Sequence, residues 1–266
     1  MEDLTKRAWE IFRQVQEKRP LVQCITNFVT VNDCANMILA AGGSPSMAHD
    51  IREAAEAAAA ASALVCNLGA IGDTDAMEAA GKAANLLGIP VVFDPVAAGG
   101  TSLRRAEAAR LMRAVHFSVI RGNASEIRFL AGEQSSGSGV DAGMFDEITE
   151  ENLSAAIGIV KGLAEKTGSV IAVSGRLDLI SDSRRTAVLR NGSPVMARIT
   201  GSGCMLTALT GAFCGACQKD CFTAAFAASA VMGVCGELAD AKRLERDAVF
   251  TWTEKQFTEE INYEIF

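Results

Sequence analysis

The chain has 266 residues, of which 49% are hydrophobic and 21% are charged, and its formal net charge at pH 7 is −7. This composition supplies a large apolar core and excludes an intrinsically disordered chain. The negative charge disfavours nucleic acid as the main partner, because contacts to a phosphate backbone need a basic surface, and a small molecule is the expected ligand.

The first ten residues are charged throughout and lack the apolar core of a signal peptide, so we expect a cytoplasmic protein with no membrane partner. The eight cysteines are scattered through apolar segments, and reduced thiols are expected in that compartment. No linker of biased composition divides the sequence, which predicts one domain over residues 1–266.

Short runs rich in valine and isoleucine, bounded by glycine, proline or aspartate, predict buried parallel strands. They cover residues 63–68, 90–94, 117–122 and 169–174. Alanine-rich stretches between them, at 50–62 and 73–87, predict helices that begin with cap-type residues. This alternation predicts an α/β fold, with a mostly parallel central sheet and helices on both faces.

The second half of the sequence has a different pattern. Three short runs predict hairpin strands at a sheet edge, at 179–181, 186–189 and 194–197. The apolar stretches 204–216 and 221–239 predict buried helices, and the polar residues 218–220 between them leave neither half long enough to span a bilayer. The segment 134–143, rich in serine and glycine, predicts a mobile surface loop.

Residues 200–207 read Thr-Gly-Ser-Gly-Cys-Met-Leu-Thr, where a loop becomes a long apolar helix. Gly201 and Gly203 let the backbone approach a ligand, and the helix that starts near Cys204 directs unpaired N–H groups at it, as in a phosphate site. We expect a lowered pKa for the Cys204 thiol there, so that it is partly thiolate and takes part in proton transfer. The alternative is a turn before a packed helix with a buried cysteine.

Charged residues stand at the ends of two predicted strands. Asp94 ends one strand, while Arg121 ends the next and Glu126 lies in the helix that follows. Ligands bind at the carboxyl ends of such strands, so these residues should converge with Ser174 and the Gly201 loop. Two carboxylates beside an arginine can hold Mg²⁺ and phosphate, which favours phosphoryl transfer. Taken singly, Asp94 is also explained as a cap before a proline and Glu126 as a carboxylate at a helix start.

The whole set resembles the hydroxyethylthiazole kinases of thiamine salvage, a family of the ribokinase-like superfamily. The resemblance runs nearly from end to end, and together and in order the segments are highly specific. They are 20–27 (Pro-Leu-Val-Gln-Cys-Ile-Thr-Asn), 42–47 (Gly-Gly-Ser-Pro-Ser-Met), 94–96 (Asp-Pro-Val), 121–123 (Arg-Gly-Asn), Glu126 and 200–207. The resemblance implies a ribokinase-like fold and transfer of the ATP γ-phosphoryl group, with Mg²⁺, to the primary alcohol of 4-methyl-5-(2-hydroxyethyl)thiazole.

The resemblance also implies roles for single residues. The ATP contacts are Arg121 and Ser174, the thiazole contacts are Met47, Gly201 and Asn27, the metal residues are Asp94 and Glu126, and the catalytic junction is Gly201, Gly203 and Cys204. Without the resemblance, Met47 is better explained as a core residue. Members of the family are homotrimers with the thiazole pocket between subunits. The resemblance would therefore place Asn27 and Met47 beside the catalytic loop of a neighbouring subunit.

Two residues depart from the pattern of the superfamily. Cys204 stands where most ribokinase-like enzymes carry an aspartate as general base, although cysteine is usual in the thiazole kinases. A thiol with a pKa of about 8.5 is a poor base, and the γ-phosphate could instead receive the substrate proton. Ala97 stands where the family more often has glycine, and we expect a small adjustment near the metal and the phosphates.

Three other functions remain as alternatives. A nucleotide-dependent dehydratase shares the fold and the anion site, a hydroxymethylpyrimidine kinase fits the 42–47 and Cys204 segments poorly, and a thiazole-binding protein without catalysis would suit Ala97 if its methyl group blocked metal. A dinucleotide-binding domain is disfavoured, because no Gly-x-Gly-x-x-Gly follows the first strand.

Overall fold

The computed structural model of the chain describes residues 2–132 and 147–245, and the predicted loop 134–143 lies outside these residues. One sheet of eight strands has the order β2-β1-β3-β4-β5-β6-β7-β8. Its strands are β1 (Leu21–Ile25), β2 (Ser44–Ser46), β3 (Ala63–Asn67), β4 (Val91–Asp94), β5 (Val119–Asn123), β6 (Val170–Ser174), β7 (Asp178–Ser181) and β8 (Thr186–Leu189). The strands β1 to β6 pair in parallel, and β7 and β8 add an antiparallel edge, which confirms the mostly parallel sheet.

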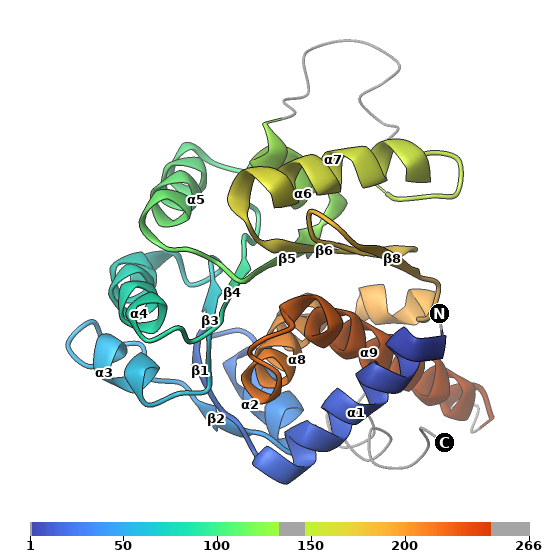
Figure 1. The fold of residues 1–266 in the computed structure, drawn as a ribbon, viewed down its shortest axis with the longest axis horizontal. Helices are drawn as coiled ribbons and strands as arrows, with labels where there is room; N and C mark the ends of the chain where they lie inside the picture. The colour runs from blue at the N-terminus through green and yellow to red at the C-terminus, as the bar shows by residue number, and fades with distance from the viewer. Residues whose placement is uncertain (1, 133–146, 246–266) are drawn as a thin grey trace.

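Helices cover both faces of the sheet (Figure 1). One face carries α3 (Ala54–Ala59), α4 (Thr74–Leu86), α5 (Ser102–Ala114), α6 (Ala124–Ala131) and α7 (Leu153–Thr167). The other face carries α1 (Glu2–Lys18), α2 (Val31–Ala40), α8 (Ser202–Ala216) and α9 (Cys221–Glu245). Short 3₁₀ turns form at Ile71–Asp73 and Pro194–Arg198. Each face of the sheet is therefore buried under its own layer of helices, and the apolar strands need this double cover.

Helix α1 was not anticipated from the charged N-terminal sequence. Its apolar residues Ala8, Ile11, Phe12 and Val15 recur at helical spacing and are buried in the core beneath α8 and α9. The charged residues between them occupy the outer side, so the segment is an amphipathic helix.

Two expected elements differ in the structure. Residues 194–197 were expected as a strand, but Pro194–Arg198 is a 3₁₀ helix, because Pro194 stands at its start and the Ser193 side chain accepts a hydrogen bond from the Val195 N–H. The helix expected over 50–62 is shorter, at Ala54–Ala59, since the Asp50 carboxylate accepts from the Arg52 N–H and holds a turn before it.

Helix α9 is longer than expected. It runs for 25 residues to Glu245. Its length and composition would therefore suffice to cross a membrane, whereas the sequence predicted a stretch too short to do so. In the structure, 67% of its most apolar 18-residue stretch is buried inside the protein. It packs on β6 and β7 and against α1 and α8, so it serves here as a core helix.

Helix α8 lies unusually close to the sheet, and this places its first turn at the site described below. A Cβ atom on Gly211 would lie 2.5 Å from Val65 Cγ2 in β3 and 3.0 Å from Val22 Cγ1 in β1. Only glycine permits this approach. The start of the helix consequently sits above the carboxyl ends of β3 and β4.

Candidate functional site

A buried carboxylate, Asp94, occupies the centre of the site. Its side chain is 2% exposed, and its Oδ2 accepts hydrogen bonds from Thr207 Oγ1 at 2.7 Å and from Asn67 Nδ2 at 3.0 Å. Arg121 Nη1 lies 3.9 Å from the same oxygen. Among the described residues, none donates a hydrogen bond to Oδ1. One oxygen is thus fully supported by the protein, and the other remains open for a ligand.

The charge on this carboxylate is finely balanced. Burial raises the pKa of Asp94 to about 6, the positive charge of Arg121 opposes that rise, and the negative charge of Glu126 adds to it. The two carboxylates therefore lie close enough to repel each other. A buried carboxylate with a second, half-buried carboxylate and one arginine nearby suits a cationic ligand.

Arg121 connects three parts of the site. It is 7% exposed on β5, and its Nη2 donates a hydrogen bond to Ser174 Oγ at the end of β6. A Cβ atom on Gly203, in the first turn of α8, would lie 2.7 Å from Arg121 Nη1. The guanidinium therefore lies directly against the glycine-rich turn, which confirms the expected convergence of Asp94, Arg121, Ser174 and that turn.

Gly201 forms the entry to α8. It has a left-handed conformation with φ of 82°, and the helix begins at Ser202, two residues before the expected start. A side chain at Gly201 would collide with the Thr30 side chain. Both the backbone conformation and the close neighbour therefore require glycine at this position.

Cys204 lies within this network, but its titration differs from the expectation. Its Sγ lies 3.2 Å from Asn67 Nδ2 and 3.4 Å from Asn27 Nδ2, two amides that can donate to it. Burial and the nearby charge of Asp94 nevertheless raise the pKa of the thiol above its usual value. The predicted lowering of the pKa is therefore wrong, because burial and the charge of Asp94 together outweigh the hydrogen bonds that favour the thiolate. Cys204 is a neutral thiol at neutral pH.

Asn67 was missed by the sequence analysis, although it joins two predicted site residues. It is 1% exposed at the end of β3, and its Nδ2 lies between Asp94 and Cys204. The signal was its place in the sheet, since Asn67 pairs in register with Asp94. That register depends on which strands are neighbours, and the sequence does not state it.

Glu126 is tied to the backbone on both sides. Its Oε2 accepts from the Asn123 N–H at 2.8 Å as part of a capping box, and its Oε1 accepts from the Ala97 N–H at 2.9 Å. Ala97 has a left-handed φ of 53°, which costs an alanine about 1 kcal/mol relative to glycine. The methyl group of Ala97 thus lies in a strained turn that Glu126 holds in place.

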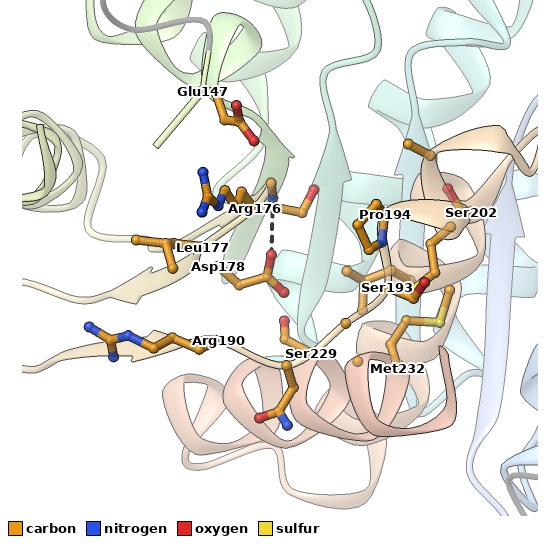
Figure 2. A pocket seen from close by; sticks show the side chains of 18 of the residues that line it. Glu147, Arg176, Leu177, Asp178, Arg190, Ser193, Pro194, Ser202, Ser229 and Met232 are labelled. Atoms are coloured by element: carbon orange, nitrogen blue, oxygen red, sulfur yellow. Dashed lines mark hydrogen bonds between the residues drawn. The ribbon is translucent and has the colours of Figure 1, made fainter. Parts of the chain in front are cut away.

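A cavity of about 980 Å³ opens beside this network. Arg121, Ser174 and Gly203 are among the residues that line it, and Figure 2 shows Asp178 on one side of the cavity and Ser193 and Met232 on the other. Met47 is not part of this lining. It is partly buried and packs against the core on the α8 side, which is consistent with a core residue.

Comparison with known proteins identifies the family. Residues 12–261 match the hydroxyethylthiazole kinase family. A hydroxyethylthiazole kinase from Ruminiclostridium cellulolyticum is 45% identical over 241 residues, which cover 90% of this chain and 86% of the relative.

Solved structures agree with this result. A hydroxyethylthiazole kinase protein from Pyrococcus horikoshii OT3 is 33% identical with a TM-score of 0.82, and the match covers 96% of this chain and 92% of that one. A ribokinase-like superfamily protein from Enterococcus faecalis V583, at 9% identity and a TM-score of 0.51, shares the fold over 92% of this chain and 86% of its own. The chain therefore has a ribokinase-like fold and belongs to the hydroxyethylthiazole kinase family.

Proposed function

We propose that this chain transfers the γ-phosphoryl group of ATP to the primary alcohol of 4-methyl-5-(2-hydroxyethyl)thiazole. The observation that carries the proposal is the contact of the first turns of α8 with Asp94 and Arg121, beside a cavity that Arg121 lines and that is large enough for a nucleotide. Backbone N–H groups in the turn from Gly201 to Cys204 would receive the charge of the moving phosphoryl group.

Mg²⁺ fits the carboxylates that lie beside the cavity, next to Arg121. The open Oδ1 of Asp94 and the mutual repulsion of Asp94 and Glu126 are features that a hard cation with oxygen ligands satisfies. Because both Glu126 oxygens already accept backbone hydrogen bonds, we propose that Asp94 holds the ion directly and Glu126 through water. When bound, Mg²⁺ would neutralise charge on the phosphates.

The transfer itself follows from how the residues are arranged. The substrate hydroxyl lies over Cys204, its oxygen attacks the γ-phosphorus in line, and the bond to the bridging oxygen of the leaving ADP breaks. Arg121, held by Ser174, steadies the polyphosphate. Because the Cys204 thiol keeps its proton, the hydroxyl proton passes to an oxygen of the γ-phosphate, and Cys204 orients the alcohol.

We further propose a cytoplasmic homotrimer with thiazole sites between subunits. Beside Asn27, Phe28 and Val29 are 90% and 59% exposed, and a neighbouring subunit would cover these apolar side chains. All eight cysteines are free, which fits a reducing compartment.

Sedimentation velocity at micromolar concentration should give a particle three times the 27.9 kDa mass of the chain. A monomer under those conditions would contradict the shared site.

An assay with a panel of small primary alcohols tests the function directly. With Mg²⁺ and ATP, ADP release should depend on the thiazole alcohol, and hydroxymethylpyrimidine should give little product. A hydrated dinucleotide should be left unchanged, which separates this kinase from a dehydratase of the same fold. If ADP formation did not respond to the thiazole, the proposed reaction would be refuted.

Gly203→Ala should separate activity from stability. The new methyl group would meet the Arg121 guanidinium, 2.7 Å from its Nη1, and displace it from the phosphates. We expect kcat/KM to fall by about 100- to 1,000-fold, the usual effect of losing one charge-stabilising donor. The melting temperature should fall only modestly, because the greater helix propensity of alanine offsets part of the cost of moving Arg121 away from the buried Asp94. Gly158→Ala in α7, where a Cβ atom meets nothing within 4 Å, should leave kcat/KM unchanged.

Cys204 variants test whether the sulfur orients the substrate. Cys204→Ser keeps a small group that can accept from Asn67 and Asn27, and it should retain most of kcat, whereas Cys204→Ala should lower kcat about tenfold or more. Because the raised pKa keeps the thiol protonated near neutral pH, the rates of the wild type and of Cys204→Ser should depend on pH in the same way between pH 7 and 8. Equal rates for wild type and Cys204→Ala would exclude a role for the sulfur.

A further inference from the structure

Asp178, the first residue of β7, places a carboxylate inside the large cavity. Figure 2 shows its side chain turned into the space between the loop that follows β6 and Ser193. Its Oδ1 accepts a hydrogen bond from the Gly175 N–H at 3.0 Å, and no described residue donates to its other oxygen. One oxygen of Asp178 is therefore available to whatever fills the cavity.

This carboxylate cannot serve the phosphates of a nucleotide. Burial raises the pKa of Asp178 to about 6, while the Gly175 N–H and the charge of Arg121 oppose the rise. The carboxyl group is therefore mostly ionised at neutral pH. An ionised carboxylate only accepts hydrogen bonds, and phosphate oxygens are acceptors of the same charge. The donors that ATP can offer are its two ribose hydroxyls and the exocyclic amine of adenine.

The position of Asp178 selects the ribose among these donors. Val173 pairs with Leu179 across the β6 to β7 hairpin, so Asp178 lies next to Ser174. Ser174 and Arg121 form the phosphate end of the cavity in the proposed function, and the sugar is the first group beyond the phosphates. Met196 and Met232 also line the cavity, and they supply an apolar surface that suits the base.

We propose that Asp178 determines nucleotide specificity by accepting a hydrogen bond from a ribose hydroxyl of ATP with its free oxygen, while its other oxygen holds the Gly175 amide. Carboxylates contact ribose in the same way in dinucleotide-binding folds of a different class. The inference rests on the proposed function, because it takes ATP to occupy this cavity with its phosphates at Arg121.

Asp178→Asn is the matched variant. The asparagine Oδ1 can still accept from Gly175, so the loop is preserved, but the charge and the second acceptor are lost. Wild type should show a KM for 2′-deoxy-ATP or 3′-deoxy-ATP about 10- to 150-fold above that for ATP, the effect of one hydrogen bond to a charged group. In Asp178→Asn the KM for ATP should rise toward that of the deoxy analogue, with kcat and the KM for the thiazole little changed.

Glu150→Gln controls for the charge of the cavity. Glu150 lines the rim and pairs with Arg190 at 2.8 Å, so the variant also removes one negative charge. It should change the KM values for ATP and the deoxy analogues by the same factor and leave their ratio intact. If Asp178→Asn did the same, or if wild type did not distinguish ATP from either deoxy analogue, the proposal would be overturned. Loss of discrimination against inosine triphosphate alone would assign Asp178 to the base and overturn it as well.

Calorimetric binding of ADP and its 2′- and 3′-deoxy analogues without thiazole separates this inference from the proposed function. If ADP binds but Asp178→Asn leaves the discrimination unchanged, the ribose contact alone is wrong. If no nucleotide binds and the thiazole elicits no ADP, the function assigned to the cavity is wrong, and the ribose contact is wrong with it.

Discussion

The burial of one negative charge, that of Asp94, is the constraint on which the rest of the site depends. A carboxylate without water is costly unless hydrogen bonds and an opposite charge replace its hydration. Thr207 from α8, Asn67 from β3 and Arg121 from β5 supply these replacements, so three separate elements must meet at one oxygen. The carboxyl ends of the strands and the start of α8 are therefore held next to one another.

This arrangement is feasible because glycines let α8 approach closely. Gly211 lets the body of the helix rest on β1 and β3, Gly203 leaves room for the Arg121 guanidinium, and Gly201 makes the left-handed turn beside Thr30. A methyl group at any of these positions would move the helix, the arginine or the loop. Gly201 and Gly203, which suggest a phosphate site in the sequence, therefore also allow the packing that orients Thr207 toward Asp94.

The sequence was sufficient to predict the layers of the fold and most of the residues that converge. Buried parallel strands have apolar runs with clear ends, so Asp94 and Arg121 could be placed at the same edge of the sheet. The missed features depend on tertiary packing. Asn67 became visible only through its register with Asp94, and the raised pKa of Cys204 comes from burial, which a helix-terminus argument does not include. The amphipathic α1 was obscured by its charged outer residues, and the 3₁₀ turn at Pro194–Arg198 by its apolar composition.

The residues at positions 126 and 97 are not the ones that would make this part of the chain most stable. The charge of Glu126 raises the pKa of Asp94, so its presence makes the buried carboxylate harder to keep ionised. The backbone at Ala97 adds strain through its left-handed conformation, and it donates its N–H to that same Glu126. An uncharged residue at position 126 would relieve the repulsion. Two neighbouring carboxylates of this kind fit the divalent cation that we propose for this site, because its charge would remove the repulsion that the protein alone leaves in place.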